Sequence, residues 1–334
     1  MKNILIYAVA LRSSGGLTIL NEYHDYYYKN NCKDYHYYFI VSTPELNCND
    51  CVTVLRYPWI AKSWAYRLYF EVFILPDIIV KNKIDKIFSL QNILIQGIKV
   101  PQVLYLHNSL PFVNYHFSFF ENRALWFYQN PIGFFIKKSI KNAEKVIVQT
   151  KWLKRRIVEQ CGVNPDKVEI KIPKLDINDV ISYTNALDTR HCFFYPATPH
   201  TYKNHKILFA AVKELVDRGY NNFEIVLTIK GSENDLAKGL YTYAVENKLP
   251  INFRGVIPRG EVFSMYSKSV LVFPSYIESL GLPLLEAKMS GTPIIAADTI
   301  FAREILKGYD NIDYFKYNDS KCLTRCMNKY LQEK

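Results

Sequence analysis

The stretch SVLVFPSYIESLGLPLLEAKMSGTPIIAAD, residues 269–298, is the most informative part of this chain. An apolar run ends near Phe273, a polar loop follows, and Gly281-Leu282-Pro283 begins a helical segment with Pro in a favoured early position. The helix is expected to end at Gly291, a common residue after a helix, before a second apolar run over 292–298. The stretch therefore predicts a buried strand, a loop, a short helix and a second buried strand.

Short apolar runs alternate with helix-length segments over the whole chain. Continuous apolar strands with helices between them indicate an α/β fold with parallel sheets covered on both faces. We predict two doubly wound, Rossmann-like domains, residues 1–180 and 181–334, joined within the polar segment 172–191, with a last helix that could pack back on the first domain. Ligands of such sheets bind beyond the carboxyl ends of the strands, so a cleft where the two domains face each other is the expected site. The expected strands are 3–10, 86–90, 102–108 and 145–150, then 192–197, 223–229, 269–275 and 292–298.

Two carboxylates frame the helix start in the stretch 269–298. Glu278 lies in the loop, and Glu286 lies in the first turns of the helix, eight residues later. The free amides around Leu280–Leu282 suit a diphosphate. Glu286 can accept two hydrogen bonds from a vicinal diol such as ribose, and Glu278 can reach a sugar beside the phosphates. A nucleotide sugar presents diol, diphosphate and hexose in that order.

The Glu-x7-Glu segment resembles that of the retaining glycosyltransferases of family 4, also called glycosyl transferases group 1, which have the GT-B fold. Four more elements follow in the family's order: Gly15-Gly16 after the first strand, His107 after the strand QVLYL, the segment VIVQTKWLKRRI, and Lys203. The resemblance implies that Gly15 and Gly16 approach donor phosphates and acceptor, that His107 lies near the donor sugar, and that Lys203 grips the diphosphate. The alternatives are a glycine turn, a structural histidine and a solvated lysine.

One position departs from the family pattern. Many members have a Gly-Arg pair whose Arg lies five residues before the lysine, whereas this chain has Ala197-Thr198. Thr198 can donate one neutral hydrogen bond where Arg would supply a charged fork. Arg254, Arg259 or Lys230 could supply the missing charge, and the sequence leaves the three open.

Donor specificity and metal dependence follow from the same residues. The base is expected to contact Gly255 and Val256, and the sugar Glu278 and the Ser279–Leu282 loop, which leaves UDP-, GDP-, ADP- and dTDP-sugars as candidate donors. No Asp-x-Asp occurs in the chain, so we expect metal-independent transfer in which Lys203 and helix-terminal amides stabilise the departing diphosphate. The resemblance implies retention, with the acceptor hydroxyl attacking from the leaving-group face and Glu278 positioning the sugar without becoming a covalent nucleophile.

Composition limits the class of partner. The chain has 334 residues, 49% hydrophobic and 22% charged, which excludes wholesale disorder. Its net charge is +11, and residues 1–170 hold 21 basic and 13 acidic groups (+8), so a polyanion is expected at the first domain. Segments 57–73 and 132–145 interleave aromatic and basic residues, as in helices that lie on an anionic membrane surface; the alternative is that their apolar faces pack on the sheet. No nucleic-acid-binding module is recognisable.

We therefore predict a retaining glycosyltransferase of the hexosyltransferase type that moves a sugar from a nucleotide diphosphate sugar to a glycan. The acceptor is expected to be a lipid-linked oligosaccharide in surface polysaccharide biosynthesis of the O-antigen or capsule type. Seven scattered Cys indicate reduced thiols, and hence a cytoplasmic protein, peripheral at the inner face of the membrane. The alternatives are a sugar-nucleotide epimerase or hydrolase of the same fold, and a catalytically weak nucleotide-sugar-binding protein.

Overall fold

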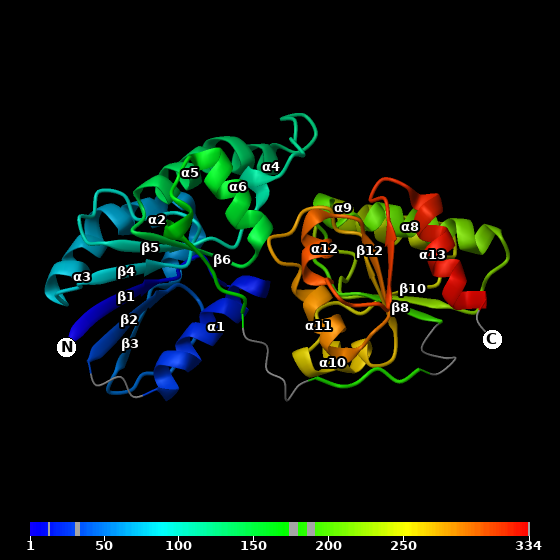
Figure 1. Cartoon of the computed structure of the whole chain (residues 1–334), viewed down its shortest axis with the longest axis horizontal. Helices are drawn as coiled ribbons and strands as arrows, with labels where there is room; N and C mark the ends of the chain where they lie inside the picture. The colour runs from blue at the N-terminus through cyan, green and yellow to red at the C-terminus, as the bar shows by residue number, and fades with distance from the viewer. Residues whose placement is uncertain (13, 31–33, 174–179, 186–190, 333–334) are drawn as a thin grey trace. The chain divides into compact units, whose positions relative to one another are not determined.

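The computed structural model describes residues 1–12, 14–30, 34–173, 180–185 and 191–332. The chain divides into two compact units, Met1–Lys174 and Leu175–Lys334. Each unit has its own parallel sheet with helices around it (Figure 1). Part of the polar segment 172–191 lies outside the described residues.

The first unit contains a seven-stranded parallel sheet in the order β3-β2-β1-β4-β5-β6-β7. In the centre, Ile6 of β1 pairs with Phe39 of β2 on one side and with Phe88 of β4 on the other. Residues 5–7 are fully buried, as expected of a strand covered on both faces. The strands are β1 (Lys2–Tyr7), β2 (Tyr35–Val41), β3 (Val52–Arg56), β4 (Lys86–Ser89), β5 (Gln102–Tyr105), β6 (Lys145–Val148) and β7 (Val168–Ile170).

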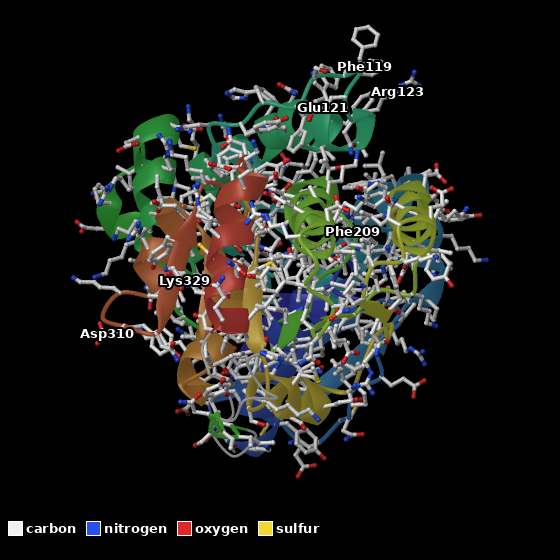
Figure 2. The ribbon with its side chains drawn as sticks, turned by 90° about the vertical axis from the view of Figure 1, so that its right-hand side faces the viewer. Phe119, Glu121, Arg123, Phe209, Asp310 and Lys329 are labelled. Atoms are coloured by element: carbon white, nitrogen blue, oxygen red, sulfur yellow. The ribbon has the colours of Figure 1, made fainter. Side chains whose placement is uncertain are left out.

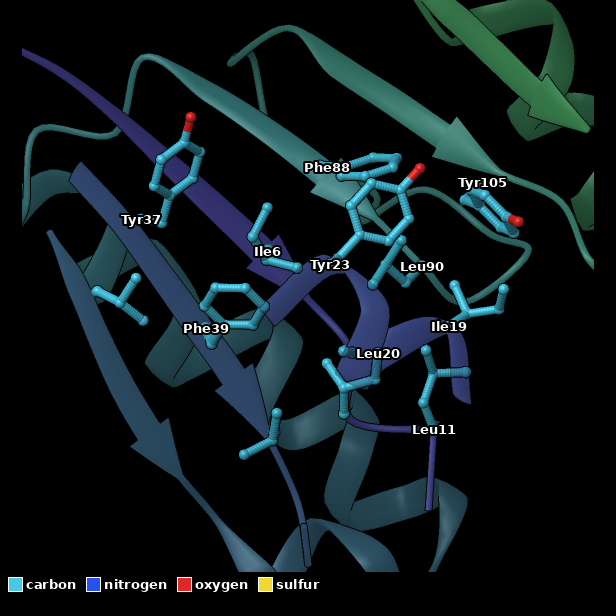
Figure 3. Packing of buried hydrophobic residues seen from close by; sticks show 13 residues of the cluster. Ile6, Leu11, Ile19, Leu20, Tyr23, Tyr37, Phe39, Phe88, Leu90 and Tyr105 are labelled. Carbon is cyan, nitrogen blue, oxygen red and sulfur yellow. The ribbon is translucent and has the colours of Figure 1, made fainter. Parts of the chain in front are cut away.

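Helices cover both faces of this sheet. Helix α1 (Ser14–Lys29) packs on one face through Ile19, Leu20 and Tyr23, which meet side chains of β1, β2 and β4 (Figure 3). The other face is covered by α2 (Trp64–Tyr69) and α3 (Leu75–Lys81), which are joined by a π-turn whose Phe70 is fully buried. The remaining helices are α4 (Arg123–Phe127), α5 (Gly133–Asn142) and α6 (Lys151–Cys161).

The second unit contains a six-stranded parallel sheet in the order β10-β9-β8-β11-β12-β13. Its last helix, α13, packs on α8 and β13 of the same unit. The strands are β8 (Cys192–Tyr195), β9 (Glu224–Leu227), β10 (Ile251–Phe253), β11 (Val270–Phe273), β12 (Ile294–Ala297) and β13 (Ile312–Phe315). The helices are α8 (His205–Asp217), α9 (Asp235–Glu246), α10 (Arg259–Tyr266), α11 (Leu282–Ser290), α12 (Ile300–Ile305) and α13 (Ser320–Gln332).

The predicted α/β class with two doubly wound sheets is confirmed. All eight predicted strands occur, and α11 begins after Gly281 and ends before Gly291, both in the left-handed region at φ +76° and +73°. Five strands escaped prediction: β2, β3, β7, β10 and β13. Strand β2 reads YHYYFIV and β13 reads IDYF, and their polar groups hide the continuous apolar character that marked the other strands.

Candidate functional site

Lys203 and Glu278 meet where the strand order of the second sheet reverses. Lys203 ends the turn after β8, and Glu278 lies in the loop after its neighbour β11. The chain runs from β8 toward one edge and from β11 toward the other, so these two loops border the crevice in which open α/β sheets bind ligands. The Lys203 ammonium forms an ion pair with the Glu278 carboxylate, and the side chains are only 15% and 14% exposed.

Neighbouring groups fix the backbone that carries this ion pair. The Tyr195 hydroxyl donates to the Lys203 carbonyl oxygen at 2.7 Å. Asn204, left-handed at φ +60°, starts α8 and donates its Nδ2 to the Tyr317 carbonyl at 2.7 Å. The Tyr276 amide donates to the Tyr202 carbonyl at 3.1 Å, which joins the two loops directly. The distance between Lys203 and Glu278 is therefore set by the fold and not by flexible side chains alone.

Glu286 points into the interior of the second unit. Its residue is only 3% exposed, and its Oε2 accepts a hydrogen bond from the Tyr266 hydroxyl at 2.9 Å. Arg259 Nη1 lies 2.8 Å from Oε1 in an ion pair, yet Oε1 accepts no well-directed hydrogen bond from the described residues. Burial raises the pKa of Glu286, and the opposing effects of Arg259 and Tyr266 do not cancel that rise. Oε1 is thus a buried acceptor with capacity for one more donor.

The predicted diphosphate seat before α11 is tightly packed. Leu280 is buried, whereas Ser279 and Leu282 are half-buried. A Cβ on Gly281 would lie 3.3 Å from Leu284, and its left-handed φ also favours glycine. Thr198, on the other side of the crevice after β8, is exposed.

The three cations proposed to replace the missing Arg differ in their surroundings. Arg254 forms an ion pair with Glu261 at 2.6 Å. Lys230 is exposed, and its stem lies across Gly255, where a Cβ would come within 2.8 Å of it. Arg259 forms an ion pair with the predicted donor-binding carboxylate, Glu286. Val256, expected at the base, is almost fully exposed.

In the first unit, Gly15 and Gly16 do not form a loop. They lie in the first turn of α1, so the prediction of a glycine loop needs correction. A Cβ on Gly16 would lie 3.0 Å from the Leu11 side chain, whereas one on Gly15 would meet nothing within 4 Å. The helix approaches the preceding chain so closely at this point that a side chain larger than that of glycine would crowd Leu11, which explains the glycine at position 16.

His107 follows β5 and is held by Asn92 from the loop after β4. The Oδ1 of Asn92 accepts the backbone N–H groups of His107 at 2.8 Å and Asn108 at 3.1 Å, and its Nδ2 lies 3.2 Å from His107 Nε2. Since Nδ2 can only donate, Nε2 accepts, and the ring proton resides on Nδ1. These bonds also turn residues 106–108 out of the predicted strand. Burial lowers the pKa of His107 to about 4, so the ring is neutral near pH 7.

Asn92 itself lies at φ +66° and is buried, in the crevice where the first sheet reverses between β1 and β4. Asparagine tolerates this left-handed conformation better than most residues. Among the described residues, His107 Nδ1 is buried without a hydrogen-bond partner. Asn92 therefore fixes both the ring orientation and the tautomer of His107.

In the part of the chain that the structure describes, no three His, Cys, Asp or Glu side chains gather in a way that could hold a metal ion. None of the helices in this part of the chain has both the length and the apolar character needed to cross a bilayer. Cys48, Cys161, Cys192, Cys322 and Cys326 are free thiols, while Cys32 lies outside the described residues.

The second unit has a recognisable family. Residues 181–334 match the glycosyl transferases group 1. The resemblance to group 1 glycosyltransferases is therefore confirmed, and this match contains Lys203, Glu278, Arg259 and Glu286.

Two curated relatives of the group 1 family match about half of the chain. A D-inositol 3-phosphate glycosyltransferase of Corynebacterium diphtheriae is 28% identical over 176 residues, which cover 47% of this chain and 41% of that protein. The O-antigen chain mannosyltransferase RfbU of Salmonella typhimurium is 27% identical over 177 residues, 52% of this chain and 47% of that one. The matches thus span less than half the length of these relatives.

Among solved structures, the complex of Anabaena Alr3699/HepE with UDP and glucose is similar over 100% of this chain and 90% of that one. The TM-score is 0.72 at 15% sequence identity. This likeness shows the fold, and the chain has the GT-B fold.

Two residues of the site were missed from the sequence. Tyr266, at the end of α10, has no motif that links it to Glu286. Asn92 had a usable signal, because it is a polar residue just after a strand that adjoins the first strand, the criterion that selected Glu278.

Proposed function

We propose that this protein is a retaining glycosyltransferase that moves a sugar from a nucleoside diphosphate sugar to a glycan acceptor. The observation that carries the proposal is the Lys203–Glu278 ion pair in the crevice between β8 and β11, with buried Glu286 eight residues further on. Lys203 supplies a cation for the diphosphate, Glu278 a carboxylate for the sugar and Glu286 a carboxylate for the ribose.

Lys203 and Glu278 change partners when the donor binds. Lys203 moves from Glu278 to the diphosphate oxygens and stabilises the charge that develops as the sugar leaves. Glu278, released from the lysine, accepts hydrogen bonds from sugar hydroxyls and stabilises positive charge at the anomeric carbon. Glu286 accepts a ribose hydroxyl at Oε1, its remaining acceptor position.

The transfer step conserves the anomeric configuration. The bond between the anomeric carbon and the diphosphate oxygen breaks while the acceptor oxygen bonds to the same face of that carbon. The acceptor proton passes to a donor phosphate oxygen, so no protein base is required. His107, neutral with its proton on Nδ1, serves as a hydrogen-bond donor toward the sugar and not as the base.

Arg259 is proposed as the replacement for the Arg that family members place where this chain has Thr198. Two observations support it: Arg259 already contacts Glu286, and Arg254 is paired with Glu261. When a ribose hydroxyl binds Glu286, the guanidinium turns to the diphosphate. Lys203 and Arg259 then supply positive charge for a transfer that does not depend on metal.

The donor is proposed to carry UDP, GDP, ADP or dTDP. The UDP held by the similar Anabaena protein supports the uridine class. We assign residues 181–334 to the donor nucleotide and residues 1–180 to the acceptor, with Gly15 and Gly16 of the first domain at the donor phosphates and His107 at the donor sugar. Gly255 and Val256 lie at the base.

The acceptor is proposed to be a lipid-linked oligosaccharide of surface polysaccharide synthesis, at the cytoplasmic face of the membrane. The likeness of the second unit to an O-antigen chain mannosyltransferase supports this pathway class.

Product analysis tests the reaction. Purified protein is incubated with each nucleotide sugar, EDTA and detergent-dispersed lipid-linked glycan, and the new linkage is analysed by NMR. Transfer with the donor's anomeric configuration supports the proposal. An inverted product would refute retention, release of free sugar without acceptor would favour a hydrolase, and interconversion of the nucleotide sugar would favour an epimerase. Donor binding with none of these would leave a binding protein.

A further inference from the structure

The segment from Trp64 to Ile74 exposes several large apolar side chains and buries its charged pair. Trp64, Leu68 and Phe73 are 62%, 63% and 64% exposed, on a helical stretch whose charges point inward. Arg67 and Glu71 are largely buried and pair with each other at 2.8 Å. Glu71 also accepts a hydrogen bond from the buried Tyr7 hydroxyl at 2.9 Å. Phe70 of this segment packs on the sheet, whereas Trp64, Leu68 and Phe73 do not.

The exposed residues recur every four positions along two adjacent rows. One row is Trp64, Leu68 and Val72, and the other is Ala65, Tyr69 and Phe73. An apolar groove of about 480 Å³ lined by Trp59, Ala65, Tyr66 and Tyr69 continues this surface. No acidic residue is exposed between Lys62 and Ile74, and the rows end at Asp77 of α3.

A second helix of the first unit presents a similar surface with added charge. The outer face of α5 carries Phe134, Phe135, Lys138 and Lys141 and no acidic residue. At the start of α4, the Arg123 guanidinium lies 5.2 Å from the ring of Phe119, which belongs to the preceding loop together with Glu121 (Figure 2). Lys138, Lys141 and Arg123 thus lie on surfaces that also carry aromatic side chains.

Both surfaces lie on one side of the seven-stranded sheet. Helices α2 and α3 cover the face opposite α1, and Figure 1 places α5 on that same side. Topology agrees, since the connections from β3 to β4 and from β5 to β6 cross in the same direction along the sheet.

We infer that this face, formed by residues 62–73 and by the outer side of α5, docks on an anionic lipid surface. Aromatic and aliphatic side chains enter the headgroup boundary, and the lysines contact lipid phosphates or carboxylates. The proposed function places the acceptor in that lipid. The inference rests on the proposed function only for what docking would achieve, which is access to the acceptor. A membrane needs no matching shape, which suits long exposed apolar rows with basic neighbours better than a protein partner does.

Vesicle binding tests the inference directly. The full chain is sedimented with phosphatidylcholine vesicles. These contain either no anionic lipid or roughly 30% phosphatidylglycerol. We expect strong binding to the anionic vesicles, weakened by salt and by removal of the charged lipid. Equal binding to both vesicles, or to neither, would overturn the docking face.

Two sets of variants separate the apolar and basic contributions. Trp64→Ser, Leu68→Ser and Phe73→Ser together should weaken binding at least tenfold, and Lys138→Glu with Lys141→Glu roughly fivefold for each lysine. The matched control is Tyr241→Ser, Val245→Ser and Ile300→Ser in the second unit, exposed by 46%, 61% and 61%. Unchanged binding in the first triple variant, or equal loss in the control, would refute the proposal. A dimer of the wild type that the first triple variant abolishes would instead assign the face to a second copy.

This design distinguishes a failure of the docking proposal from a failure of the proposed glycosyl transfer. Transfer to a soluble glycan should be unaffected by the first triple variant, whereas transfer to acceptor embedded in vesicles should fall. If the first triple variant loses vesicle binding but keeps transfer to the soluble glycan, the docking proposal is supported. If the wild type binds vesicles but no nucleotide sugar, the proposed glycosyltransferase function is refuted and the docking proposal stands.

Discussion

The Lys203 ammonium and the Glu278 carboxylate neutralise each other in a crevice from which water is largely excluded. Neither group is available to a donor until the ion pair opens. A nucleotide sugar presents an anion to the lysine and hydroxyl donors to the carboxylate. The diphosphate therefore takes the place of Glu278 at the lysine, and the sugar hydroxyls take the place of Lys203 at the carboxylate.

Removing one partner of this pair should affect turnover and stability differently. Lys203→Ala should lower kcat by about 100- to 1,000-fold, because a fixed cation for the leaving group is lost. The unpaired Glu278 should also cost about 1–3 kcal/mol of unfolding free energy. Lys203→Met with Glu278→Gln should regain most of the stability and none of the activity, as measured by urea unfolding and initial rates. Full activity of Lys203→Ala would contradict the assignment.

Arg259 and Arg254 make a matched pair for testing the missing phosphate contact. Arg259→Ala should weaken nucleoside diphosphate binding about 10- to 100-fold in calorimetry and leave binding of the nucleoside nearly unchanged. Arg254→Ala, which removes a cation already paired with Glu261, should change either affinity less than about threefold. The reverse order would assign the phosphate contact to Arg254.

The tautomer of His107 depends on the polarity of Asn92. With the native asparagine, ring ¹⁵N shifts should report a neutral imidazole with its proton on Nδ1, and His107→Gln identifies the signal. Asn92→Asp replaces the Nδ2 donor by an acceptor, so the proton should move to Nε2 and the pKa of His107 should rise above its value of about 4.

Asn92→Gly is the control, because it permits the left-handed backbone and removes both side-chain contacts. A merely structural Asn92 would leave Asn92→Asp and Asn92→Gly alike in tautomer and in kcat. An Nε2-protonated ring in the wild type would contradict the geometry.

Buried histidines make the fold sensitive to acid. Burial lowers the pKa of His107 to about 4, and burial with the nearby Lys203 charge lowers that of His205 to about 3, against 6.5 for an unperturbed histidine. Below pH 6.5 and above the pKa of each folded histidine, the unfolded chain binds protons that the folded chain does not. Unfolding free energy should therefore be unaffected by these groups above pH 6.5 and should fall as pH drops toward 4.

His205→Phe should reduce this acid sensitivity, because the aromatic ring can keep its packing on Tyr195, 4.9 Å away, without a titrating group. Guanidinium unfolding of both proteins at pH 7.5 and pH 5 measures the difference. An equal loss of stability in the variant would show that other groups cause it.

Much of the architecture could be predicted because buried parallel strands leave continuous apolar runs. The α11 segment was predicted almost to the residue, since Gly281, Pro283 and Gly291 act locally on helix ends. The strand YHYYFIV was missed because hydroxyl and imidazole groups interrupt its apolar character, although Tyr37 and Phe39 are buried against α1. The residue types alone do not show that such aromatic side chains are buried.

The structure brings some of the predicted site residues together and adds contacts that the sequence did not indicate. Lys203 and Glu278 were proposed separately, and the structure brings them together because they follow adjacent strands. The Arg259 and Tyr266 contacts with Glu286 depend on how α10 packs on α11, which spacing alone does not reveal. The inward Arg67–Glu71 pair likewise reverses the burial expected for a helix of that composition.

The most direct test is thermal stabilisation by UDP-, GDP-, ADP- and dTDP-sugars in EDTA, with wild type, Lys203→Ala and Glu286→Ala. At about 100 times Kd, one nucleotide class should raise the Tm of the wild type by roughly 5–10 °C and neither variant should respond. No shift with any donor, or a shift that persists unchanged in both variants, would contradict the proposed nucleotide-sugar site.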